Sequence, residues 1–131
     1  MPMDDIARVR AMYEAFAQGD LAACIVHLDA NLEIRQTERL PWGGEYRGLA
    51  GAQEFFGKLA ANLDGGFDGR NARVFDAGNA IVAIGEVKAT ARKSGKPLHI
   101  PAVHIWHFRD GKAVSFQAFI ETPAALAALA A

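Results

Sequence analysis

Helical periodicity dominates the first third of the chain. Apolar residues recur every three or four positions over residues 4–18, which predicts a first helix, and Gly19 is a natural stop for it. Asp20 is a suitable cap for a short second helix. The apolar face of that second helix is expected to carry Leu21, Cys24, Ile25 and Leu28. Alternation over residues 32–37 then predicts a short strand.

The second half of the chain changes from helical to extended periodicity. A loop at residues 41–44 is followed by a third predicted helix over residues 49–63. Four further strands are expected over residues 70–76, 79–93, 96–109 and 112–121. The Asp110-Gly111 pair between the last two strands is typical of a tight hairpin, because glycine accepts a positive φ without steric cost. The alanine-rich residues 123–131 are expected to form a short helix or a frayed tail.

This order of elements predicts one α+β domain over residues 1–131. Three helices interrupted by a strand come first, and an antiparallel meander follows. A curved sheet wrapped around the helices is a stable way to bury the apolar faces of both. The 131 residues suit one domain, and the 51% hydrophobic content is enough to build its core.

Apolar residues occupy both faces of the last two predicted strands, which suggests that both faces are covered. One face carries Leu98, Ile100, Ala102, His104, Trp106 and Phe108, together with Val114, Phe116, Ala118 and Ile120. The opposite face carries Pro101, Val103, Ile105 and Phe119. Since the helices can cover only one face, we expect a homodimer through the outer face. The alternative is a monomer whose outer face stays partly exposed.

Charge and cysteine content exclude several classes of partner and location. The net charge is -1 and the basic residues are scattered, which argues against binding to nucleic acid or to an anionic membrane. No apolar stretch approaches the roughly 20 residues of a membrane span, and the acidic start of the chain is unlike a signal peptide. We therefore expect a cytoplasmic protein. Cys24 is the single cysteine and is expected to be a small buried hydrophobe.

Four segments resemble proteins of the SnoaL-like, ketosteroid-isomerase-like family in the nuclear transport factor 2-like superfamily. They are residues 13–20, residues 41–48 with the Phe55-Phe56 pair that follows, residues 103–112 and residues 116–122. The resemblance implies a cone-shaped mixed or antiparallel sheet around the helices of the N-terminal half, with a pocket inside. It implies less about activity, because the superfamily contains isomerases, polyketide cyclases, epoxide hydrolases, binding modules and inactive scaffolds.

The resemblance and the face assignments together predict the residues that point into the cone. The mixture of apolar, aromatic and a few polar side chains is typical of a small-molecule pocket, although a solid core would have the same composition. The predicted lining is Met12, Phe16, Gln36, Trp42, Phe56, His104, Trp106, Phe116, Ala118 and Ile120. The resemblance implies that Trp42 and Tyr46 form a lid, and the alternative is that they only anchor their loop.

The catalytic groups of the family are replaced at the matching positions. The oxyanion tyrosine of ketosteroid isomerases falls on Met12, and Tyr13 is expected to point elsewhere on the helix. The isomerase base falls on Gln36, which cannot accept a proton near neutral pH. The second isomerase donor falls on His104, which also matches the histidine of the polyketide cyclases, but the aspartate of those cyclases falls on Ala118. Neither established mechanism is expected.

His104 and Gln36 remain the candidate catalytic residues. His104 could act as an acid, a base or a hydrogen-bond donor, and Gln36 could orient it or a ligand carbonyl; a satisfied core histidine is the alternative. No cofactor and no metal site are predicted, because His27, His99 and His107 lack the spacing of metal ligands. Two functions stay open: an isomerase-, cyclase- or lyase-type enzyme or binder for a small hydrophobic carbonyl compound, and a non-catalytic dimeric module for ligand or protein binding.

Overall fold

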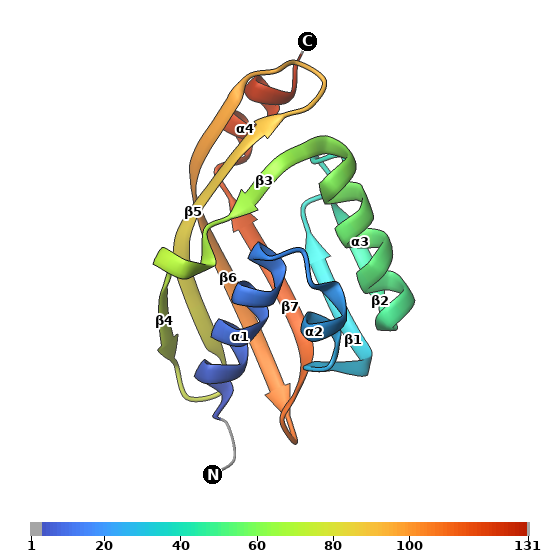
Figure 1. Ribbon diagram of the computed structural model, residues 1–131, viewed down its shortest axis with the longest axis vertical. Helices are drawn as coiled ribbons and strands as arrows, with labels where there is room; N and C mark the ends of the chain where they lie inside the picture. Colours follow the sequence, from blue (N-terminus) through green and yellow to red (C-terminus); the bar gives the residue numbers. More distant parts are fainter. Residues whose placement is uncertain (1–3, 131) are drawn as a thin grey trace.

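A curled mixed sheet with helices on its concave face forms the core of the computed structural model, which describes residues 4–130 (Figure 1). Figure 1 shows α1, α2 and α3 on one side of the long strands β5, β6 and β7. The elements are α1 (Asp5–Ala17), α2 (Leu21–Ile25), β1 (Leu28–Gln36), β2 (Gly44–Arg47), α3 (Gly48–Asn62), β3 (Leu63–Phe67), the 3-10 turn η1 (Gly69–Asn71), β4 (Arg73–Asp76), β5 (Ile81–Ala91), β6 (Pro97–Arg109), β7 (Lys112–Ile120) and α4 (Thr122–Leu129).

The strands of this described region are ordered β2-β1-β7-β6-β5-β3, and β4 pairs with the remaining length of β5. The β1–β7 pair is parallel, whereas the other pairs are antiparallel. The expected α+β class, with a mixed curved sheet around helices, is therefore confirmed.

Alternation along β6 decides which side chains enter the interior. Leu98, Ile100, Ala102, His104 and Trp106 are all buried on the concave side. The residues between them are less buried and lie on the outer face. Because successive side chains of a strand point to opposite faces, this part of the interior follows directly from the sequence.

Three predicted boundaries around the helices are wrong. Helix α2 ends at Ile25, and Leu28 begins strand β1 instead of extending the helix face. Strand β1 therefore starts four residues before the predicted start at residue 32, and its Leu28 pairs with Ala113 of β7. The third helix ends at Asn62, and Leu63 already belongs to a strand.

Two short strands, β2 and β3, were not expected. Strand β3 contains Gly65 and Gly66, residues that are depleted in strands, but it pairs along its whole length with β5. Gly65 has a φ of +102°, and a Cβ there would lie 2.5 Å from the carbonyl oxygen of Lys88. Glycine is therefore required at this close approach of two strands. In the run predicted over residues 70–76, only β4 is extended, because Arg70 lies in η1.

A β-bulge shifts the face assignment at the start of β7. The register between β6 and β7 breaks between His107 and Phe108. Ala113, opposite Phe108, is fully buried, whereas Val114 is only partly buried. The expectation that Val114 shares the inner face is therefore wrong, since a bulge adds one residue and reverses the alternation beyond it.

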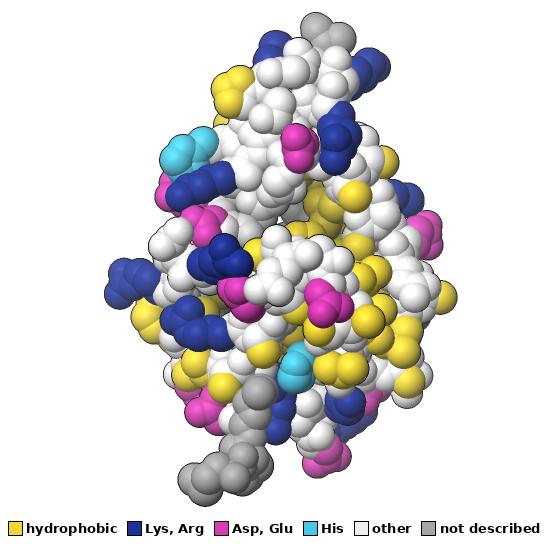
Figure 2. Space-filling view, in the orientation of Figure 1, with side chains coloured by type: hydrophobic (Ala, Val, Ile, Leu, Met, Phe, Trp, Pro, Cys, Tyr) yellow, Lys and Arg dark blue, Asp and Glu magenta, His cyan; other side chains and the backbone are white. Residues whose placement is uncertain are grey.

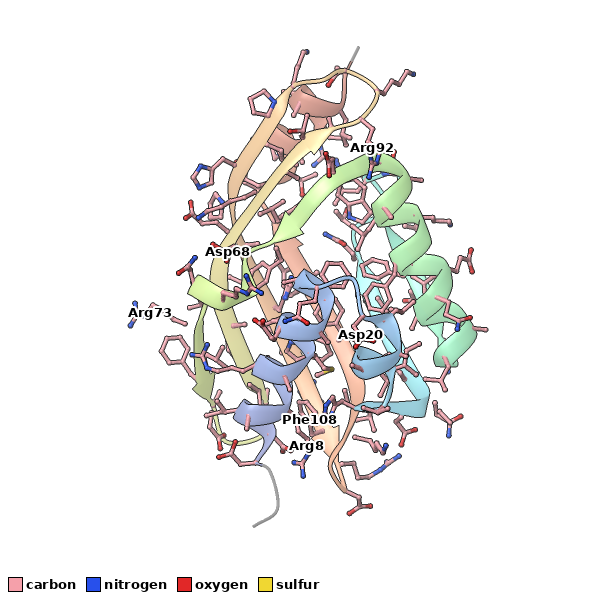
Figure 3. The ribbon with its side chains drawn as sticks, in the orientation of Figure 1. Arg8, Asp20, Asp68, Arg73, Arg92 and Phe108 are labelled. Atoms are coloured by element: carbon pink, nitrogen blue, oxygen red, sulfur yellow. The ribbon has the colours of Figure 1, made fainter. Side chains whose placement is uncertain are left out.

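Side-chain hydrogen bonds stabilise the start of α4 and the end of α3. The alanine-rich end forms helix α4, whose first turn is capped by the Glu121 carboxylate accepting from the amide of Ala124. Figure 3 places Arg92 beside the end of α3, where its guanidinium donates to the carbonyl oxygen of Ala60 at 2.7 Å. These contacts hold the rim of the cone at the end away from α1.

Candidate ligand pocket

A cavity of about 100 Å³ lies between the helices and the concave face of the sheet. Figure 2 shows a hollow in the helix-bearing face, with hydrophobic side chains visible inside it. All ten residues expected at the pocket lie on the cavity wall, although their roles toward a ligand stay predictions. They are Met12, Phe16, Gln36, Trp42, Phe56, His104, Trp106, Phe116, Ala118 and Ile120.

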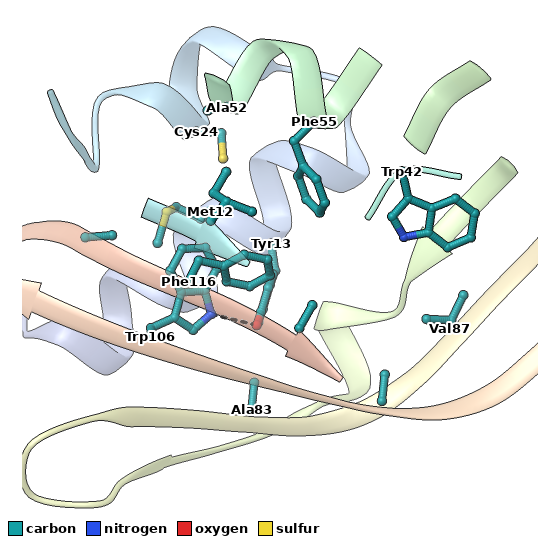
Figure 4. Packing of buried hydrophobic residues seen from close by; sticks show 14 of the residues in the cluster. Met12, Tyr13, Cys24, Trp42, Ala52, Phe55, Ala83, Val87, Trp106 and Phe116 are labelled. Atoms are coloured by element: carbon teal, nitrogen blue, oxygen red, sulfur yellow. Dashed lines mark hydrogen bonds between the residues drawn. The ribbon is translucent and has the colours of Figure 1, made fainter. Parts of the chain in front are cut away.

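A buried hydrogen-bonded group joins α1 to β6 inside this cavity (Figure 4). The indole Nε1 of Trp106 donates to the hydroxyl oxygen of Tyr13 at 3.0 Å. The same hydroxyl lies 2.8 Å from Nδ1 of His104. The expectation that Tyr13 points away from the site is therefore wrong. Tyr13 and Met12 both face the interior, because α1 packs with a broad apolar stripe that includes both positions.

Aromatic rings hold the imidazole of His104 in place. The ring centroid of Phe67 lies 3.9 Å from that of His104, and Phe116 contacts it edge-on with a centroid distance of 4.8 Å. His104 is only 8% exposed. Burial disfavours the charged imidazolium and lowers the pKa of His104 to about 3. The side chain is therefore neutral at physiological pH.

Gln36 contributes a second polar group to the cavity wall. Its Oε1 accepts a hydrogen bond from Nε1 of Trp42 at 3.0 Å. Because this bond uses the carbonyl oxygen of the amide, the NH₂ group of Gln36 is the end that can serve as a donor to a ligand.

Trp42 and Tyr46 have different positions. Trp42 lines the cavity and is almost completely buried. Tyr46 is not part of the wall; its hydroxyl donates to the carbonyl oxygens of Trp42 and Gly43. Tyr46 therefore anchors the loop, and neither ring forms an exposed lid.

Cys24 also lies on the wall, as a buried thiol. Burial raises the pKa of Cys24 to about 11, so the thiol stays protonated and poorly nucleophilic at neutral pH.

The cavity wall is free of formal charge. Among the residues that the structure describes, its lining contains no Asp, Glu, Lys or Arg. Over residues 4–130 there is also no group of three or more His, Cys, Asp and Glu side chains that could hold a metal ion. The polar side-chain groups on this wall are those of His104, Tyr13, Gln36 and Cys24, together with the N–H groups of Trp42 and Trp106.

The sequence reasoning missed Tyr13 and Phe67. A signal for Tyr13 was present, because it belongs to the same helical stripe as Met12 and Phe16. Phe67 follows two glycines at the end of the unexpected strand β3, where no periodic pattern marks it.

Comparisons with known proteins agree with this architecture of a curled sheet enclosing a mostly apolar cavity. A profile of the SnoaL-like domain matches residues 9–116. The chain therefore belongs to the SnoaL-like family. No curated protein matches it in sequence.

Several solved structures share the fold. An NTF2-like protein from Burkholderia thailandensis is 25% identical and has a TM-score of 0.89, with 99% of this chain and 100% of that chain covered. TerC, co-crystallised with polyporic acid, is 25% identical with a TM-score of 0.83 and coverage of 95% and 96%. A candidate polyketide cyclase from Pseudomonas putida is 19% identical with a TM-score of 0.84 and coverage of 98% and 100%.

Across residues 4–130, no helix has the length and apolar character needed to cross a membrane. The cytoplasmic location expected from the sequence stays a prediction.

Proposed function

We propose that this protein binds a small, mostly apolar molecule in the cavity, with a carbonyl-type oxygen of that molecule directed at His104. The observation that carries this proposal is a neutral imidazole on the wall of an otherwise largely apolar cavity. A few placed polar groups in an apolar pocket orient a ligand, whereas the apolar surface supplies most of the affinity.

The proposed activity is of the isomerase, cyclase or lyase kind. In such reactions negative charge develops on a carbonyl oxygen, and a hydrogen-bond donor in a dry cavity stabilises it. Membership of the SnoaL-like family supports this class of chemistry. The structure of TerC with polyporic acid supports a small organic molecule as the ligand.

The size of the cavity limits the ligand or requires movement at the mouth. An engineered apolar cavity of about 150 Å³ can hold benzene, and this cavity measures about 100 Å³. A larger ligand would have to displace side chains at the opening. Phe16 is the best placed to move, because this wall residue is 37% exposed. Its ring lies beside that of Phe56, with a centroid distance of 5.5 Å, so its movement would widen the opening next to Phe56.

The alternative is a non-catalytic binding module. The uncharged cavity wall favours this alternative, because proton transfer between carbons ordinarily needs a carboxylate or another base. The two functions differ in turnover and share the same binding site.

A thermal-shift screen tests binding. Wild type, His104→Ala and the control His99→Ala would be screened against steroids, aromatic polyketide analogues, terpenoids and small ketones. His99 is exposed on the outer side of β6, so its loss leaves the cavity intact. We expect one class to stabilise wild type and the His99 variant but not the His104 variant, because ligands raise the apparent stability by mass action.

The same screen can contradict the proposal. If no class shifts the melting temperature, or if His104→Ala binds as well as wild type, the cavity is not the site proposed here. Turnover of a bound compound that is lost in His104→Ala would exclude the non-catalytic alternative.

We also propose that a second copy of the chain covers the outer face of the sheet. Ile84, Val103 and Phe119 form a row across three neighbouring strands, and the exposed fractions of Ile84 and Phe119 are 44% and 53%. Val82 and Ile105 form the next apolar row. Apolar rows that are exposed on one chain and match themselves by twofold symmetry favour a dimer.

Light scattering of Phe119→Asp tests this interface. We expect the variant to be monomeric where wild type is dimeric. Val26→Asp is the matched control, because Val26 is 58% exposed at the end of α2 and lies away from the outer face. A wild-type monomer, or a dimer that survives the Phe119 substitution, would contradict the proposal.

A further inference from the structure

The hydrogen bonds around Tyr13 restrict where the protons of His104 can lie. An indole N–H can only donate, so the hydroxyl oxygen of Tyr13 must be the acceptor of the bond from Trp106. The single hydroxyl hydrogen of Tyr13 then remains to be placed, and Nδ1 of His104 lies 2.8 Å away.

The opposite arrangement leaves a buried donor unpaired. If Nδ1 of His104 carried the hydrogen, the oxygen of Tyr13 would accept two hydrogen bonds and its own O–H would need another acceptor. No other acceptor for Tyr13 is found in the described part of the chain. An unpaired hydroxyl in this buried position carries a desolvation penalty. The favoured arrangement therefore runs from Trp106 to Tyr13 and from Tyr13 to Nδ1.

The second ring nitrogen of His104 is left available. The hydrogen bonds within residues 4–130 include none to Nε2. Nε2 of His104 also keeps some accessible surface. Within residues 4–130, the one side-chain nitrogen or oxygen that is both fully buried and without a hydrogen-bond partner is Nδ1 of His107, not Nε2 of His104. Phe67 and Phe116 hold the ring so that Nδ1 faces Tyr13.

We propose that Tyr13 is a positioning residue that holds His104 as the neutral imidazole with its hydrogen on Nε2. His104 then offers the cavity a hydrogen-bond donor and does not act as a base. This inference rests on the proposed function and narrows it to ligands that present an acceptor oxygen at His104, such as ketones, quinones and other conjugated carbonyl compounds.

Gln36 also favours ligands that present an acceptor oxygen. Its carbonyl oxygen already accepts one hydrogen bond from Trp42, whereas the hydrogen bonds within residues 4–130 include none from its NH₂ group, which is the donor available to a ligand. A ligand with two acceptor oxygens fits two donors, and an amine or another donor finds no carboxylate on the wall. An Nε2–H donor would bind and polarise the carbonyl oxygen of such a ligand, and it takes up no proton itself.

The tautomer can be measured directly in the wild-type protein without any ligand. Long-range ¹H–¹⁵N correlation spectra of the full chain at pH 7 distinguish Nδ1–H, Nε2–H and the charged ring. We expect His104 to show a protonated Nε2 and an unprotonated, hydrogen-bonded Nδ1. A hydrogen on Nδ1, or a charged ring, would overturn the inference.

The Tyr13→Phe variant tests whether Tyr13 is responsible. We expect its His104 nitrogen signals to move, because Nδ1 loses its donor. Tyr46→Phe is the matched control: it also removes a hydrogen-bonded hydroxyl from a buried tyrosine, and that residue lies outside the cavity wall. Unchanged His104 signals in Tyr13→Phe would refute the positioning role. If Tyr13→Phe does not fold, the wild-type spectrum still decides the tautomer.

A pair of ligands of similar shape separates this inference from the proposed function. Cyclohexanone has an acceptor oxygen where methylenecyclohexane has a CH₂ group. We expect wild type to prefer the ketone by about tenfold, and we expect the preference to shrink in Tyr13→Phe. Equal binding of both compounds would overturn the donor role of His104. If neither binds, the proposed ligand class is contradicted, whereas the role of Tyr13 is still decided by the spectra.

Discussion

Replacing Gly69 with alanine should test the contact that positions Tyr13. Gly69 is buried in the turn η1, directly against α1. A Cβ at this position would overlap Cβ and Cγ of Tyr13 and would lie 2.7 Å from Cδ2, whereas ordinary contacts begin at 3.4 Å. The tyrosine side chain would have to retreat by about 0.7 Å to clear Cδ2 alone, and by more to clear Cβ and Cγ.

The expected loss can be worked out from the surroundings of Tyr13. Its Cβ is fixed to the backbone of α1, and its ring packs on Phe67 with a centroid distance of 5.1 Å. The ring therefore cannot move without disturbing its neighbours. Overpacking of this kind costs about 2–3 kcal/mol. For a chain of this size, that loss lowers the melting temperature by about 8–12 °C.

Urea unfolding of Gly69→Ala should be compared with Gly57→Ala. Gly57 is exposed in the middle of α3, and a Cβ there meets nothing within 4 Å. Alanine stabilises a helix interior relative to glycine by about 0.5–1 kcal/mol. The same chemical change should thus lower the urea midpoint at position 69 and raise it at position 57. A midpoint for Gly69→Ala at or above the wild-type value would refute the packing described here.

Two further substitutions have defined outcomes. Burial lowers the pKa of His104 from 6.5 to about 3, so the unfolded chain binds more protons in this window and the free energy of unfolding should fall as the pH drops from about 6.5 toward 3. His104→Gln should remove up to about 1.4 kcal/mol per pH unit of that slope; equal slopes of wild type and His104→Gln in urea titrations would contradict the buried neutral state. Gln36→Leu should cost about 1–2 kcal/mol of stability by leaving Nε1 of Trp42 without its acceptor, and unchanged unfolding would show that this bond contributes nothing.

Much of the fold could be predicted because burial imposes a period on the chain. The alternation of β6 assigned His104 and Trp106 to the inner face, and the helical stripe of α1 assigned Met12 and Phe16. These assignments need only local geometry, since a strand repeats every two residues and a helix every 3.6. The ten positions placed on the cavity wall follow from this periodicity and the family resemblance together.

Errors arose where a partner elsewhere in the chain overrides the local pattern. Strand β3 exists because β5 pairs with it, and the glycines that weaken its local signal permit the close approach of the two strands. The bulge opposite His107 and Phe108 likewise depends on how β6 meets β7. It buries Ala113 and leaves Val114, which was expected on the inner face, only partly buried.

The chemistry of the site depends even more strongly on long-range approach. Residue types identified His104 as a candidate, but its available nitrogen depends on the hydroxyl of Tyr13, which comes from a different element. Periodicity states which face a side chain occupies and carries no information about which polar atom it meets there. Hydrogen bonds require two groups to come within about 3 Å in the right direction. The sequence could therefore assign residues to the cavity, whereas the packing of α1 against β6 determines which of their atoms can act on a ligand.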